Sequence, residues 1–100
     1  MPYIKPEDRV WYEKHINELA NALGIAKNNE IMSDMAGDMN YCISTLIGKV
    51  MGKPSYAKIA IITGVLENVK QEFYRRVGMP YEESKIVQNG DIKEYRRLYP

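Results

Sequence analysis

The side chains of this chain that could do chemistry together are acids on one predicted helix and an arginine on another. Asp34 and Asp38 are four residues apart, which places two carboxylates on one face of a helix. Arg76 lies at the edge of an apolar pattern, so its guanidinium would seek an acid such as Asp38. Such a group could be a structural lock or the floor of a small-anion site. The predicted polar cluster comprises Asp34, Asp38, Asn40, Tyr41, Glu67, Tyr74 and Arg76.

Metal-dependent and nucleophilic catalysis are less well supported. An all-α magnesium phosphohydrolase gathers several carboxylates from two helices, but Glu67 and Glu72 are five apart and point in different directions. The single histidine, His15, and the single cysteine, Cys42, fall on different predicted helices, and neither has a nucleophile motif around it. The sequence therefore predicts no catalytic residues, no metal ligands and no cofactor, and it does not favour an enzyme.

Three helices are expected to position these residues. Pro6, with acids directly after it, favours a helix start, and Gly24 predicts the end of a first helix over 6–24. Ser33 is a good N-cap for a central helix over 34–52, which Gly52 and the following Pro54 would end.

The third helix is predicted over 56–77 from a sustained apolar seam. This seam consists of Ile59, Ile62, Leu66, Val69, Phe73 and Val77, at spacings of three and four residues. Ser55 can cap its start, and Gly78 with Pro80 predicts its end. The remaining arm, 79–100, has room for a short fourth helix before the turn signal Asn89-Gly90, although a hairpin around that turn is an alternative.

The central helix has two usable faces. One is an apolar stripe formed by Met35, Met39, Cys42, Ile43, Leu46 and Val50. The other, called here the small face, consists of Gly37, Tyr41, Ser44 and Gly48. Glycine inside a helix costs about 1 kcal/mol relative to alanine, so two of them suggest close approach of another helix. Alternatively, Gly37 belongs to a frayed turn and Gly48 faces solvent.

Composition limits the classes of function. The chain has 100 residues, 45% of them hydrophobic and 27% charged, as expected for one small folded domain. The net charge of +1 gives no general argument for a nucleic acid or a membrane surface, although two Arg-Arg pairs lie near aromatic residues. No apolar run is long enough to cross a membrane and no signal-peptide pattern is present, so a cytoplasmic location is expected.

Four stretches resemble a known family. MPYI at the start, GDMNY in the central helix, EFYRR in the third helix and PYEESK followed by NGD in the arm are similar to a family of short uncharacterised prokaryotic and phage proteins. The likeness covers nearly the whole chain, although no single motif is specific. Because that family has no assigned activity, the resemblance implies a single small domain and no particular reaction.

Together these patterns predict an all-α domain with three main helices in an antiparallel bundle and a C-terminal arm across it. A two-faced central helix needs a second cover, which favours a homodimer formed through the small face. The expected function is a protein-interaction or regulatory module, and the alternative is a small-anion or nucleotide-handling enzyme. The candidate contact residues are Tyr56, Tyr74, Tyr95 and Tyr99.

Overall fold

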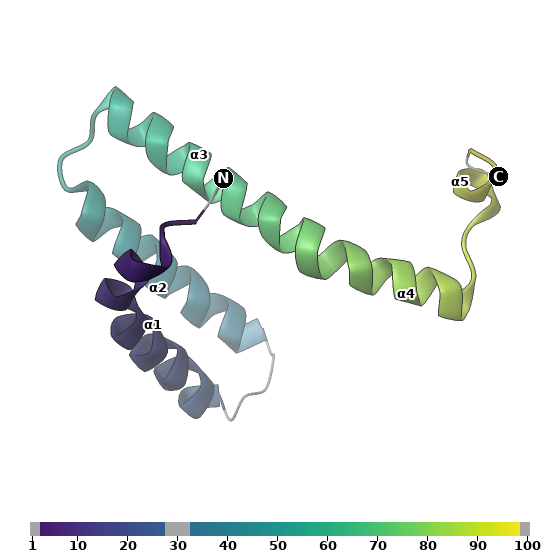
Figure 1. The fold of residues 1–100 in the computed structure, drawn as a ribbon, viewed down its shortest axis with the longest axis horizontal. Coiled ribbons are helices and arrows are strands. Elements are labelled where there is room, and N and C mark those ends of the chain that lie inside the picture. The colour runs from purple at the N-terminus through teal and green to yellow at the C-terminus, as the bar shows by residue number, and fades with distance from the viewer. Residues whose placement is uncertain (1–2, 28–32, 99–100) are drawn as a thin grey trace. The chain divides into compact units, whose positions relative to one another are not determined.

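The computed structural model describes residues 3–27 and 33–98, and these form helices with no strand among them. The elements are α1 (Pro6–Lys27), α2 (Ser33–Met51), α3 (Tyr56–Phe73), the π-helical segment η1 (Tyr74–Gly78), α4 (Met79–Asn89) and α5 (Lys93–Arg96), as Figure 1 shows. The all-α prediction is confirmed, and three of the helices are long. The chain divides into two compact units, Met1–Lys58 and Ile59–Pro100. The single domain and the antiparallel order of the helices remain predictions.

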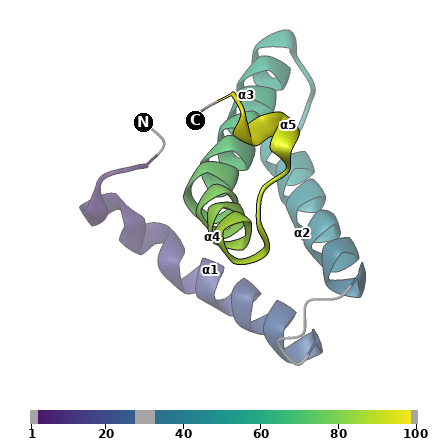
Figure 2. The ribbon, with the colours of Figure 1, turned by 90° about the vertical axis from the view of Figure 1, so that its right-hand side faces the viewer.

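The first unit contains α1 and α2, which contact each other. The end of α1 and the start of α2 lie near one another in both Figure 1 and Figure 2. As predicted, α1 starts at Pro6, and the Asp8 N–H donates to the Lys5 carbonyl at 2.9 Å. The helix extends past the predicted end at Gly24 to Lys27. Asn28 and Asn29, whose residue types favour a turn between the two helices, lie outside the described residues.

The end of α2 and the start of α3 follow the sequence prediction closely. Gly52 has a φ of 62°, a conformation that favours glycine, and its N–H donates to the Gly48 carbonyl at 3.1 Å. Ser55 Oγ accepts a hydrogen bond from the Lys58 N–H at 3.2 Å and so caps α3. The Lys58 ammonium also donates to the carbonyls of Met51 and Lys53, at 3.1 and 2.9 Å, which satisfies two acceptors of the turn.

The predicted end of the third helix at Gly78 and Pro80 is wrong, because α3, η1 and α4 follow one another without a break (Figure 1). Gly78 keeps a helical φ of −66°. The Met79 N–H donates to the Tyr74 carbonyl, five residues back, which widens the turn just before Pro80. Since proline has no N–H and its ring clashes with the carbonyl four residues earlier in a regular α-helix, the wider turn lets the helix continue.

The second unit ends in a turn and a short helix. Gly90 has a φ of 88°, and its N–H donates to the Ile86 carbonyl at 2.8 Å, so the predicted turn at Asn89-Gly90 is confirmed. After the turn, Asp91 Oδ1 accepts a hydrogen bond from the neighbouring Ile92 N–H at 2.7 Å, and α5 starts at Lys93.

None of the side chains that the structure describes is buried. On α2, the half-buried positions include Asp38, Cys42 and Thr45, whereas Leu46 and Val50 of the predicted apolar stripe are 57% and 74% exposed. The seam of α3 is similar, with exposed fractions between 42% at Leu66 and 65% at Phe73, apart from a half-buried Ile62. The apolar faces predicted from the sequence therefore form, and much of their area is accessible.

Gly52 has a left-handed backbone conformation whereas Gly64 lies within a helix, and this difference leads to a stability prediction. Gly52→Ala should lower the free energy of unfolding by about 1–2 kcal/mol, because its φ of 62° strains an L-residue. Gly64→Ala is the matched control, since a Cβ there meets nothing within 4 Å and alanine favours the helix by about 1 kcal/mol. Urea denaturation of both variants measures the difference; equal effects of the same sign would contradict the assignment.

Candidate functional site

The most distinctive polar structure in the second unit lies where α3 passes through η1 into α4. Residues 72–82 are called here the junction. The Tyr74 ring lies against Gly78, since a Cβ added at Gly78 would stand 2.9 Å from Tyr74 Cδ2. Beyond the glycine, the Tyr74 hydroxyl donates to Glu82 Oε2 at 2.6 Å. The glycine is needed here for space rather than for backbone freedom, because only a residue without a side chain lets the ring pass.

The Tyr74–Glu82 contact also affects the ionisation of the tyrosine. The hydrogen bond to Glu82 raises the pKa of Tyr74 above its usual 10.0, and the charges of Glu82 and Glu83 raise the pKa further. The neutral hydroxyl is therefore the form that the junction favours. Because the pKa of the folded state is raised, this stabilisation is fully present below pH 10 and is lost as the pH rises through the raised value.

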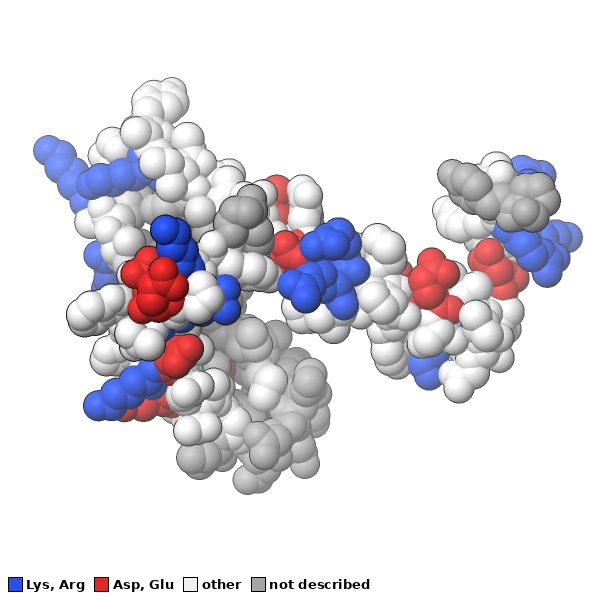
Figure 3. Space-filling view, viewed as in Figure 1, with Lys and Arg blue, Asp and Glu red and all other residues white. Residues whose placement is uncertain are grey.

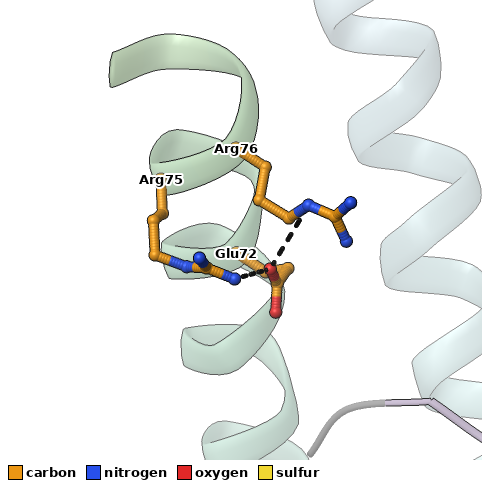
Figure 4. Close-up of polar contacts among 3 residues, drawn as sticks. All are labelled: Glu72, Arg75 and Arg76. Carbon is orange, nitrogen blue, oxygen red and sulfur yellow. Dashed lines mark hydrogen bonds and ion pairs between the residues drawn. The ribbon is translucent and has the colours of Figure 1, made fainter. Parts of the chain in front are cut away.

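One carboxylate at the junction, that of Glu72, interacts with two arginines (Figure 4). Glu72 Oε1 accepts from Arg75 Nη2 and lies 3.9 Å from Arg76 Nε. The Glu72 side chain is 21% exposed, against 66% for Arg75 and 58% for Arg76. The acid is thus enclosed while both guanidinium groups stay in contact with solvent. Ion pairs this exposed contribute little to stability, so their main effect is to fix where positive charge is presented.

The predicted polar cluster divides between the two units. Asp38, Asn40 and Tyr41 are on α2, with Asn40 Oδ1 accepting from Ser44 Oγ at 3.1 Å, whereas Arg76 is at the junction. Asp34 is on α2 as well, but its side chain lies outside the described part. Glu67 on α3 accepts from Gln71 Nε2 at 3.0 Å and is 3.9 Å from Lys70 Nζ. The grouping of the seven residues, and the pairing of Asp38 with Arg76, remain predictions.

Sequence reasoning missed the two acids that organise the junction, Glu72 and Glu82. The signal for Glu72 was its spacing of three and four residues from the two arginines. The signal for Glu82 was the equal spacing of Tyr74, Gly78 and Glu82, four residues each, along one helix face. Interpreting Gly78 as a helix end concealed that second pattern.

Among the described residues, the glycines of the small face of α2 have no close neighbour. A Cβ at Gly37 or Gly48 would meet nothing within 4 Å, and Tyr41 is 70% exposed. Neither glycine is therefore required by a close neighbour among the described residues. Contact of this face with a second copy remains a prediction.

The described ranges 3–27 and 33–98 lack two further kinds of feature. No group of three or more histidine, cysteine, aspartate or glutamate side chains there is arranged to hold a metal ion. No helix in that part of the chain is long and apolar enough to span a membrane.

Comparison with known proteins assigns the chain to a family. Residues 1–92 match DUF6899, described as a domain of unknown function. The chain therefore belongs to the DUF6899 family, in agreement with the predicted resemblance to a family without an assigned activity. Neither the curated proteins nor the solved structures gave a match.

The junction predicts a specific titration behaviour. Glu82→Gln should lower the pKa of Tyr74 towards 10, because it removes both the charge and the carboxylate acceptor that disfavour the phenolate. Tyrosine Cζ chemical shifts followed by NMR from pH 8 to 12 would measure this, with Tyr74→Phe assigning the resonance. An unchanged Tyr74 pKa in Glu82→Gln would contradict the hydrogen bond.

Proposed function

We propose that this member of the DUF6899 family is a small helical interaction module that acts as a homodimer. The observation that carries this proposal is the accessible apolar seam of the third helix. Its residues follow the three- and four-residue spacing of a helix-pairing surface, and five of the six are between 42% and 65% exposed to water. A large exposed apolar patch of this kind is typical of a protein contact surface.

The free energy available from burying the seam favours a second copy of the chain as the partner that covers it. Full burial of one valine, leucine or phenylalanine side chain stabilises by about 1.5–3 kcal/mol. A two-fold contact would cover the seam on both copies at once, against an association cost of about 4–15 kcal/mol. The small face of α2, with Gly37 and Gly48, belongs to the same proposal as a surface that a second copy can approach closely.

The experiment compares an acid placed on the seam with the same acid placed on the opposite face. Val69→Asp would bury a charge in the dimer and should yield a monomer, because an unpaired buried carboxylate is costly. Gln71→Asp, two residues along and on the opposite side of α3, should leave the mass unchanged. Light scattering over a concentration series measures both variants.

A wild-type mass that stays monomeric at all concentrations would contradict the proposal. It would mean that the seam is covered within one chain. Circular dichroism of Val69→Asp serves as the folding control, since a loss of helix would have to be separated from a loss of dimer.

A further inference from the structure

We propose that the helix formed by α3, η1 and α4 pairs antiparallel with the same helix of a second copy, about a two-fold axis near residue 75. This inference rests on the proposed homodimer and adds the orientation and register of the contact. It is carried by three parallel lines of side chains that cross the junction. All three have the apolar or charge pattern that an antiparallel copy would complement.

The central line consists of Phe73, Val77 and Tyr81, which continue the seam into α4. In a regular α-helix, a spacing of four residues drifts by about 40° per step around the axis. The π segment Tyr74–Gly78 has more residues per turn, which offsets this drift and keeps the three side chains in line. All are accessible, with exposed fractions of 65%, 53% and 63%.

The line on one side of the seam has opposite charges at its ends. It consists of Lys70, Tyr74, Gly78 and Glu82, spaced four residues apart. Glu82 is held in place by the 2.6 Å hydrogen bond from Tyr74, and the Lys70 side chain is 77% exposed. When a second copy runs antiparallel, Lys70 of each chain lies beside Glu82 of the other, so the contact forms twice.

The line on the other side of the seam also has opposite charges at its ends, over a shorter distance. Glu72 and Arg76 have opposite charges and lie on either side of residue 74. They already form an ion pair within the chain, with 3.9 Å between Arg76 Nε and Glu72 Oε1, and in the antiparallel pair the exposed guanidinium of Arg76 also lies beside Glu72 of the second copy. Figure 3 shows blue and red side chains following one another along this helix, in agreement with alternating charge.

The midpoints of the three lines indicate which partner binds this surface. The central line of Phe73, Val77 and Tyr81 is centred on residue 77, the line from Lys70 to Glu82 on 76, and the pair Glu72 and Arg76 on 74, so all three centres lie within about two residues of residue 75. A parallel copy in register would instead place Lys70 against Lys70 and Glu82 against Glu82, which repel. A surface whose charges complement themselves only after a two-fold rotation fits a second copy of this chain.

The test is an exchange of charge between Lys70 and Glu82. These residues are twelve positions apart, about 18 Å along the helix, so they cannot pair within one chain. Lys70→Glu and Glu82→Lys should each raise the dimer Kd about tenfold or more, because each change creates two repulsive contacts. The double variant Lys70→Glu/Glu82→Lys restores both contacts and should recover a Kd close to that of the wild type.

The matched control is Lys70→Glu/Glu83→Lys, which has the same composition and charge as the exchange variant. Glu83 lies one residue further round α4, away from the Lys70 line, so this variant should stay weak. Sedimentation equilibrium measures all five proteins. If both double variants recover the wild-type Kd, or if neither does, the antiparallel register is wrong. The proposed homodimer would still stand in that case, provided that the wild type is a dimer. A wild-type monomer would overturn both.

Discussion

Pro80 imposes the constraint on which the second unit depends. A proline in the middle of a helix lacks a donor and crowds the carbonyl of the preceding turn, so the chain must either end the helix or widen it. Here it widens through the π segment Tyr74–Gly78, and α4 continues in the direction of α3. The extra residue in that turn realigns the apolar side chains on both sides of the proline. The seam thus extends from Ile59 to Tyr81 along one surface.

The junction side chains support this widened turn. Tyr74 lies against Gly78 and reaches Glu82, so this side chain connects η1 to the first turn of α4. Glu72 holds two arginines on the other side of the seam. Each contact is exposed and weak alone, and their combined effect is to fix the positions of charges beside an apolar line. Fixed charges contribute more to orientation and partner choice than to stability, which fits the proposed role as an interaction module.

How far the sequence could predict this structure is clearest from two similar stretches. Gly52-Lys53-Pro54 and Gly78-Met79-Pro80 share the pattern Gly-x-Pro, and both predict a helix end. The first has a left-handed glycine at φ 62°, with Ser55 ready to cap the next helix and Lys58 satisfying the free carbonyls. The second has a helical glycine at φ −66°. The position that corresponds to Ser55 is Tyr81, which offers no cap.

Local rules therefore succeeded where the deciding contacts lie within three or four residues, as at the start of α1, at Gly52 and along the seam. They failed at Gly78, where the deciding contact spans eight residues, from Tyr74, whose ring lies against Gly78, to the carboxylate of Glu82. The grouping of Asp38 with Arg76 is of a different kind. It depends on how the first unit meets the second, which helix periodicity and capping rules do not determine.

Distances between two copies test the antiparallel pairing most directly. With Cys42 replaced by serine, a spin label is attached to a cysteine at Gln71 or at Ala60 and the distance between copies is measured by electron resonance. In an antiparallel pair centred on residue 75, the two copies of a labelled position are separated along the helix axis. This separation is about 12 Å for position 71 and about 45 Å for position 60. Similar distances at both positions would indicate a parallel pair and contradict the account.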